Sequence, residues 1–211
     1  MTVYLIRHGQ SATNLAAQFT GQLDVPLSEL GQQQARKIGE YFLGVHIDRI
    51  YSSDLCRAVD TVALLAKTHR VPMETAKEFR EIYAGAWQGM KFDDIKVNYP
   101  EEYVVWMQDI GNCVCTQGES VQELLCRVLG KLKEIAASHK DETLVIATHA
   151  TPIRALLSYL QDGNLSNMNG VPWVPNASVT KLSYENGIFT PVQIGDVSHL
   201  QGMLTTLKGN V

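Results

Sequence analysis

The chain has 211 residues, of which 45% are hydrophobic and 19% are charged. This composition provides apolar material for one sizeable core and argues against a disordered, collagen-like or low-complexity chain. With 18 Lys and Arg against 22 Asp and Glu, the net charge is −4, so there is no overall basic field to attract nucleic acid or an anionic membrane. We expect neither partner, and any anion must be bound locally.

Strands alternate with helices in the first part of the chain. Residues 3–6 form a continuous apolar run, which predicts a strand buried on both faces. Ser28 is a plausible N-cap for a helix whose apolar residues recur at helical spacing up to Phe42. Residues 47–51 and 71–74 predict two further strands. Between these two strands, Ser53-Asp54 signals the start of an amphipathic helix.

The second part of the chain begins irregularly. Residues 79–118 are rich in aromatic residues and glycine, and predict short helices and loops inserted into the α/β framework. Ser120 opens the clearest helix of the chain, and Pro152 lies near the start of another that runs to Leu160. The predicted strands of this part are 143–147, 178–184 and 188–194, the last two joined by a hairpin turn at Asn186-Gly187.

Alternating strands and helices with doubly buried strands predict an α/β fold. We expect a three-layer α/β/α sandwich with a mostly parallel central sheet and an antiparallel ending. No repeat, charge block or linker interrupts the sequence, so we interpret residues 1–211 as a single domain with an irregular and helical lid insertion at about residues 85–118.

Cysteine use and the N-terminus both favour the cytoplasm. Four cysteines do not make a disulfide framework in a chain of this length, and Cys113 and Cys115 lack the spacing of a zinc knuckle. Reduced thiols are typical of the cytosol. The first apolar run is too short for a signal peptide and stops at Arg7, and no segment has the apolar length of a membrane span.

Two histidines follow two of the buried strands. The strand at residues 3–6 runs into Arg7-His8-Gly9, and the strand at 143–147 runs into Thr148-His149-Ala150. Ligands of open parallel sheets bind beyond the carboxyl ends of the strands, so both imidazoles could face one crevice. Either histidine alone is better explained as a partly buried residue that caps its strand. The two together, beside Arg7, favour the shared crevice.

Arg57 falls in the first turn of the helix after Ser53-Asp54, where a cation opposes the helix dipole. The conflict disappears if Arg57 and the helix N-terminus share an anion, because guanidinium and exposed amide groups both bind phosphate. An ion pair with Asp54 or Asp60 on the same helix is an equally good interpretation at this stage.

Arg7, Arg57, His8 and His149 would together make a compact cationic pocket in an acidic protein. The sequence has no P-loop, no HExxH and no carboxylate cluster with the spacing of a divalent-metal site. These observations favour a pocket that handles a phosphoryl group without Mg²⁺, with side-chain cations offsetting the charge of the transition state. We therefore expect no metal and no cofactor.

Six ordered blocks span nearly the whole chain. They are residues 5–14 (LIRHGQSATN), 21–31 (GQLDVPLSELG), 52–58 (SSDLCRA), 80–89 (REIYAGAWQG), 118–120 (GES) and 196–200 (DVSHL). In this order, the blocks resemble the histidine phosphatase superfamily, the phosphoglycerate mutase-like proteins. A lone RHG tripeptide would be weak evidence, whereas six blocks in order are highly specific.

The resemblance implies a role for each residue of the pocket. His8 would be the nucleophile that carries a transient phosphohistidine, and Glu81 would protonate the leaving oxygen and later activate water. The other positions that it implies for phosphate binding are Arg7, Arg57, His149, Asn14, Gly21 and Ala150. Two observations bear on these implied roles. An ion pair with Arg80 is the alternative explanation for Glu81, and Ala150-Thr151 stands where the family usually has two glycines.

Three functions remain open on the sequence. We favour a phosphatase acting on a small phosphorylated metabolite, because the insertion carries only Lys91 and Lys96 against five carboxylates and offers few cations for a second anionic group. The alternatives are a cofactor-dependent phosphoglycerate mutase and a non-catalytic phosphate-binding module. Neither the substrate nor the oligomeric state follows from the sequence.

Overall fold

The computed structural model describes residues 1–205, and its centre is one six-stranded sheet. The strands lie in the order β3-β2-β4-β1-β5-β6, and those from β3 to β1 pair in parallel. β5 is antiparallel to both of its neighbours. The bounds are β1 Thr2–Arg7, β2 Arg49–Ser52, β3 Met73–Thr75, β4 Thr143–Thr148, β5 Val179–Glu185 and β6 Ile188–Asp196.

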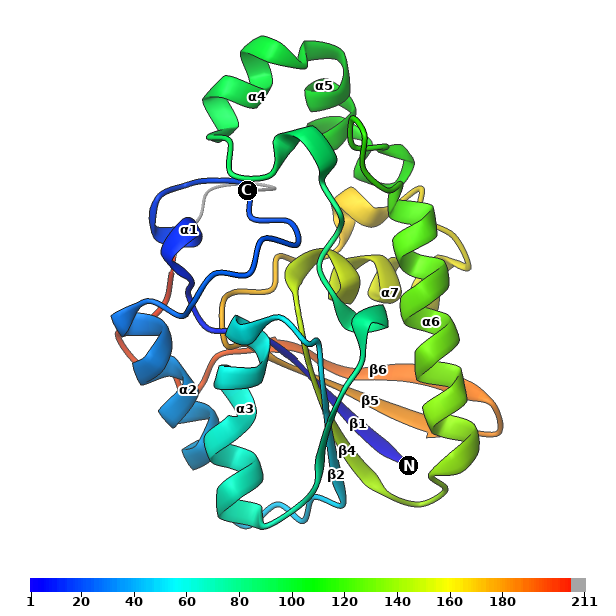
Figure 1. Cartoon of the computed structure of the whole chain (residues 1–211). Coiled ribbons are helices and arrows are strands. Elements are labelled where there is room, and N and C mark those ends of the chain that lie inside the picture. Colours follow the sequence, from blue (N-terminus) through cyan, green and yellow to red (C-terminus); the bar gives the residue numbers. More distant parts are fainter. Residues whose placement is uncertain (206–211) are drawn as a thin grey trace.

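Seven α-helices occur within residues 1–205, and four of them form the outer layers. Helices α2 and α3 lie on one side of the sheet and α6 and α7 on the other (Figure 1). The predicted three-layer sandwich is therefore confirmed. The bounds are α1 Ala12–Leu15, α2 Glu29–Tyr41, α3 Cys56–His69, α4 Phe92–Asn98, α5 Pro100–Gln108, α6 Val121–Ser138 and α7 Ala150–Asp162.

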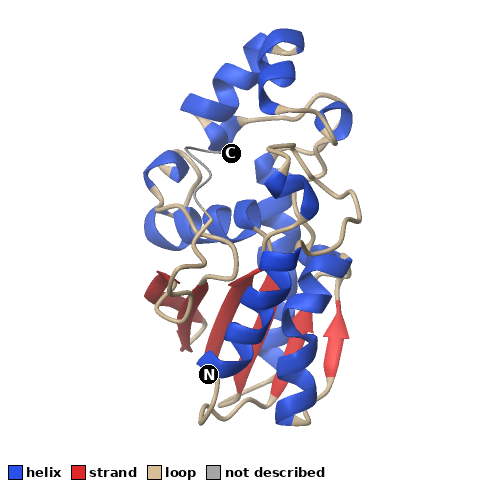
Figure 2. Ribbon diagram, turned by 90° about the vertical axis from the view of Figure 1, so that its left-hand side faces the viewer, coloured by secondary structure: helices blue, strands red, loops and turns tan. Residues whose placement is uncertain are grey.

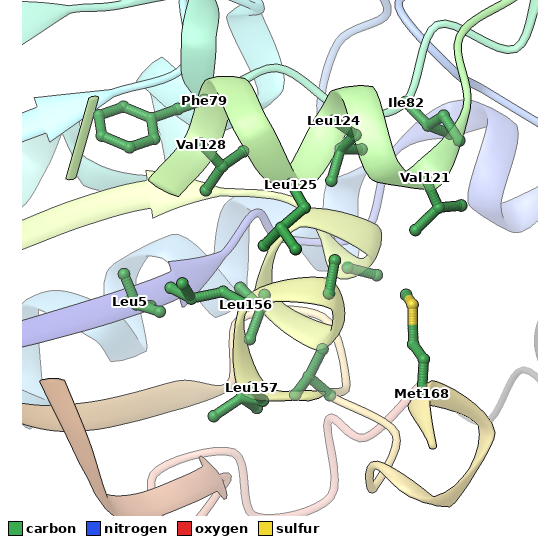
Figure 3. Close-up of a cluster of buried hydrophobic side chains, with 14 of the residues drawn as sticks. Leu5, Phe79, Ile82, Val121, Leu124, Leu125, Val128, Leu156, Leu157 and Met168 are labelled. Carbon is green, nitrogen blue, oxygen red and sulfur yellow. The ribbon is translucent and has the colours of Figure 1, made fainter. Parts of the chain in front are cut away.

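Helix α6 begins at a capping box. The Glu123 N–H donates to Ser120 Oγ, and the Ser120 N–H donates to the Glu123 carboxylate, so two end groups of the helix are satisfied. The apolar face of α6 then packs with α7 and with Leu5 of β1 in the larger core cluster (Figure 3). Burial on both sides of β1 explains its continuous apolar sequence.

The opposite face of the sheet is covered by α2 and α3. Ser28 caps α2 as predicted and accepts from the Gly31 N–H at 3.1 Å. The predicted cap of α3 is wrong: the N-cap residue is Leu55, which has no capping side chain. Asp24, 32 residues earlier, accepts from the Cys56 N–H at 2.8 Å instead, so a distant loop supplies the cap.

The last two strands form the predicted hairpin. Asn186 and Gly187 at its turn have φ angles of 51° and 85°, a conformation that asparagine and glycine accept most readily. The turn lets β5 and β6 pair antiparallel at the edge of the sheet.

The segment of residues 85–118 carries α4 and α5, which lie beyond the carboxyl ends of the parallel strands (Figures 1 and 2). We call this segment the insertion. Pro100 occupies the first turn of α5, where its missing N–H costs nothing. Trp87 and Trp106 meet Phe19 edge to face, with ring centroids 5.6 and 5.0 Å away. These aromatic contacts bind the insertion to the loop after α1. None of the helices in residues 1–205 has the length and apolar character needed to span a membrane.

Candidate active site

The carboxyl ends of β1 and β4 bring the two histidines together. Arg7 and Thr148 are partners in the parallel register, and the His8 N–H donates to the Thr148 carbonyl at 2.9 Å. The imidazole centroids of His8 and His149 are consequently 5.0 Å apart. The two imidazoles therefore meet at the strand ends, as predicted, but only His8 lines the pocket.

One hydrogen bond indicates which ring nitrogen of His8 carries the hydrogen. Its Nδ1 lies 2.6 Å from the Gly9 carbonyl oxygen, which can only accept, so Nδ1 carries the hydrogen. The pKa of His8 lies well below its ordinary value because the ring is buried and because Arg57 and Arg7 add positive charge nearby. The ring is therefore neutral at pH 7, and the lone pair is on Nε2.

Arg7 and Arg57 line the pocket that His8 faces. Both are nearly inaccessible to solvent, at 4% and 0% exposed, and burial lowers the pKa of each to about 10. Both guanidinium groups remain charged at neutral pH. Glu81 acts in the opposite direction and raises both pKa values. Arg7 and Arg57 are thus desolvated cations beside the neutral imidazole of His8.

Neither Asp54, which precedes α3, nor Asp60 within it pairs with Arg57. Its Nη1 donates to the Leu23 carbonyl and its Nη2 to the Gly21 carbonyl, both at 2.7 Å. Asp54 instead binds Arg80 through both carboxylate oxygens at 2.6 Å. The interpretation of Arg57 as an ion-pair partner on its own helix is therefore wrong. The same geometry removes the alternative explanation of Glu81, because Arg80 is engaged with Asp54.

Glu81 lies in the loop before the insertion, and its carboxylate lines the pocket. One oxygen accepts from the Ile82 N–H at 2.8 Å, and the other lies 3.4 Å from the Thr151 N–H. Arg127 of α6 fixes the backbone of this loop by donating to the carbonyl oxygens of Glu78, Arg80 and Glu81. Thr151 stands where the family usually has glycine, and its backbone N–H still points toward Glu81.

Three of the other predicted residues also line the pocket, namely Asn14, Gly21 and Ala150. The amide oxygen of Asn14 accepts from the Ser11 N–H at 3.1 Å and from Asn176 Nδ2 at 3.3 Å. These contacts orient its NH₂ group as the remaining donor. Gly21 has a φ of 53°, and a Cβ there would collide with the Gln88 side chain, so glycine suits this wall.

His149 is the predicted residue that does not line the pocket wall. It is 0% exposed, and its Nε2 lies 2.9 Å from Ser53 Oγ. Burial, followed by the charge of Arg57, depresses its pKa well below the ordinary value. The ring is neutral and contacts the His8 ring, and its Nδ1 has no hydrogen-bond partner within the described residues.

Arg154 is a pocket residue that was not predicted from the sequence. This side chain lines the pocket and is only 2% exposed, with its guanidinium carbon 5.5 Å from the centre of the Trp173 ring. Arg7 lies 4.9 Å from the same ring. A signal was present, since Arg154 is the one charged residue in a run from Ala150 to Ser158 that is otherwise apolar or small. The pocket lining also includes four aromatic residues, Phe19, Phe92, Trp106 and Trp173.

The profile of the histidine phosphatase superfamily (branch 1) matches residues 3–197, and the chain belongs to this family. Phosphoserine phosphatase 1 of Hydrogenobacter thermophilus is 34% identical over 164 residues, which are 77% of each chain. A metal-independent phosphoserine phosphatase of Arabidopsis thaliana is 31% identical over 206 residues, which cover 95% of this chain and 84% of that protein.

The fold agrees with this family. YhfR of Bacillus stearothermophilus superposes with a TM-score of 0.90 at 30% identity, and the match covers 94% of this chain and 98% of that one. Relatives that are named as phosphatases support a phosphatase here. Within residues 1–205, no group of three His, Cys, Asp or Glu side chains is arranged to hold a metal ion.

Proposed function

We propose that the protein hydrolyses a small-molecule phosphomonoester through a phosphohistidine on His8, with Glu81 as general acid and base. One observation carries the proposal: the Nδ1–H of His8 is bound to the Gly9 carbonyl, which leaves a lone pair on Nε2 of a ring that two buried arginines influence electrostatically. A neutral imidazole of fixed orientation is a competent nucleophile.

In the first half-reaction, Nε2 of His8 attacks phosphorus as the bond from phosphorus to the leaving oxygen breaks. Glu81 in its protonated form gives its proton to that oxygen, which departs as an alcohol. Arg7 and Arg57 face the phosphoryl oxygens and offset their charge, which desolvation makes more effective than it would be in water. His149 would bind a phosphoryl oxygen through Nδ1, its remaining ring nitrogen.

In the second half-reaction, ionised Glu81 takes a proton from water. The hydroxide equivalent attacks phosphorus, the bond between phosphorus and Nε2 breaks, and inorganic phosphate leaves. His8 then returns to its neutral state. Each proton removed from water is the one that Glu81 donates in the next cycle, so acid and base are regenerated together.

The pocket wall formed by the insertion favours hydrolysis over phosphoryl transfer between two sites. The insertion contributes Phe92 and Trp106 to this wall, while Lys91 and Lys96 lie outside it. A mutase must hold a highly charged bisphosphate, for which apolar rings are poor partners. The phosphatase names of the relatives point in the same direction.

Rapid quenching tests the proposal. With ³²P-labelled para-nitrophenyl phosphate and EDTA, we expect an acid-labile, base-stable adduct on His8 and release of phosphate. His8→Asn should abolish both, whereas His46→Asn, which changes a histidine at an exposed site, should leave both intact. Turnover by His8→Asn, or an adduct on another residue, would contradict the mechanism. Faster interconversion of 2- and 3-phosphoglycerate than hydrolysis would establish a mutase.

A further inference from the structure

A third arginine in the pocket has no part in the mechanism above. Arg154 projects from α7, is 2% exposed, and donates from Nη2 to the Met168 carbonyl at 3.1 Å. Its Nε has no hydrogen-bond partner within residues 1–205. Burial lowers the pKa of Arg154 only to about 10, so the group is a cation at neutral pH. A desolvated cation with an unsatisfied donor calls for an anion.

Arg154 lies on the side of the pocket where the leaving group must be. Arg154 follows Thr151 by one turn of α7, and the Thr151 N–H lies 3.4 Å from a carboxylate oxygen of Glu81. Glu81 faces the leaving oxygen in the proposed reaction. Arg154 is therefore placed to contact the alcohol part of the substrate instead of the phosphoryl oxygens.

The charges of the pocket leave one cation unmatched. Arg7, Arg57 and Arg154 carry three positive charges, and both histidines are neutral because burial and nearby cations depress their pKa values. A phosphomonoester dianion neutralises two of these charges. Glu81 must be protonated to act as the acid, so it neutralises none. One further negative charge on the substrate would balance the site.

Trp173 restricts the orientation of the Arg154 guanidinium group. Its ring lies against the guanidinium group at 5.5 Å and against Arg7 at 4.9 Å, and such stacking holds a planar guanidinium in one orientation. The planar fork of arginine matches the two oxygens of a carboxylate. A second phosphate would bring more charge than the single unmatched cation requires.

We propose that Arg154, held by Trp173, binds a carboxylate on the leaving group, so that the preferred substrates are phosphomonoesters of hydroxy acids. This inference rests on the proposed phosphatase function. It makes Arg154 a specificity-determining residue in addition to the residues that surround the phosphoryl group.

Matched substrate pairs test the inference without any variant. 3-Phosphoglycerate differs from glycerol 3-phosphate by a carboxylate in place of a hydroxymethyl group, and phosphoserine differs from phosphoethanolamine by the added carboxylate. We expect the wild-type kcat/KM to be about 10- to 100-fold higher for the carboxylate-bearing member of at least one pair, as for a charged hydrogen bond made to a buried partner. Equal values within both pairs would overturn the inference.

Substitutions test whether Arg154 is the residue responsible for the preference for a carboxylate. Arg154→Met should reduce the preference within the pair to about twofold or less, whereas Arg154→Lys, which keeps the charge but loses the fork, should retain part of it. Arg36→Met, which removes an exposed arginine on α2, should leave the preference unchanged. If Arg154→Met lowered both members of a pair by the same factor, Arg154 would be a structural residue and the inference would be wrong.

Failure of this inference differs from failure of the proposed function. If the wild-type protein hydrolyses para-nitrophenyl phosphate but ignores the carboxylate, the inference alone is wrong. If it hydrolyses no phosphomonoester, the proposed function fails and the inference fails with it. Thermal unfolding of each variant identifies any that are misfolded. If a variant is misfolded, the comparison of the matched substrate pairs with the wild-type protein decides whether the inference holds.

Discussion

The Nε2 atom of His149 lies 2.9 Å from the Oγ atom of Ser53, and both side chains are fully buried. Ser53 follows β2 and His149 follows β4, so this contact joins the ends of two adjacent parallel strands. It fixes the plane of the second imidazole, whose other nitrogen remains without a partner within residues 1–205. Ser53 is thereby a positioning residue for His149.

Ser53→Ala should lower kcat by about 3- to 10-fold with little change in KM, because it removes one hydrogen bond that orients His149 without altering the charges that bind substrate. Steady-state kinetics with para-nitrophenyl phosphate measures the effect. Ser52→Ala is the matched control, since the buried Ser52 hydroxyl donates to the Ser53 carbonyl and does not contact His149. Equal losses of kcat in both variants would remove Ser53 from the positioning role.

Stability should fall in mild acid because His8 and His149 are buried in the neutral form. Their folded pKa values lie well below the value of about 6.5 that applies to the unfolded chain. Below that pH the unfolded state binds more protons than the folded state, so the free energy of unfolding decreases as pH falls, by at most about 1.4 kcal/mol per pH unit for each histidine.

Urea unfolding at about pH 7.5 and about pH 5.5 measures this effect. His149→Gln removes one of the two groups and should reduce the difference in unfolding free energy between the two conditions. His46→Gln changes an exposed histidine and should leave the difference as it is in the wild type. A wild-type protein equally stable at both pH values would show that these imidazoles are not held neutral.

Glu81→Gln should lower kcat/KM, which reports the first half-reaction, by about 10²- to 10⁴-fold for alkyl phosphates. The loss of kcat/KM should be much smaller for para-nitrophenyl phosphate, because that leaving group departs without needing a proton. Measuring kcat/KM across leaving groups of increasing pKa reports the dependence as a slope. A uniform loss for all leaving groups would mean that Glu81 holds the substrate and does not donate the proton.

Arg127→Met should reproduce this pattern in weaker form, because Arg127 donates to three carbonyl oxygens in the loop that carries Glu81. We expect a loss of kcat/KM for alkyl phosphates that exceeds the loss for para-nitrophenyl phosphate. Arg49→Met is the control, since Arg49 forms its ion pair with Glu142 at the far end of β2. Destabilisation without any change in the leaving-group slope would assign Arg127 a structural role only.

Gly31→Ala should destabilise the protein by more than about 2 kcal/mol. A Cβ atom at this position would overlap the Gln10 carbonyl oxygen in the loop that follows His8. Gly130→Ala in α6 should instead increase stability by up to about 1 kcal/mol, because nothing obstructs a Cβ there and alanine favours the helix. Urea unfolding compares the two, and similar effects of the same sign would refute the steric argument.

Local patterns were sufficient to predict the six strands and the four outer helices in their order, but not the short helix α1. Ser28 and Ser120 satisfy the first amides of their own helices, and Asn186-Gly187 adopts the backbone that its hairpin requires. Each signal depends on residues only a few positions apart. The start of α3 was predicted wrongly because its cap, Asp24, comes from 32 residues away.

The meeting of His8 with His149 could also be predicted, since parallel strands place their carboxyl ends at one edge of the sheet. The sequence by itself therefore determined the α/β framework and the edge at which its two central imidazoles meet. Only the tertiary structure decided that Arg57 binds the carbonyls of Gly21 and Leu23, and that Arg154 reaches the pocket beside Trp173. The reason is physical: these contacts depend on the paths of loops and on the burial of a helix, which are settled when distant segments pack and leave no periodic trace along the chain.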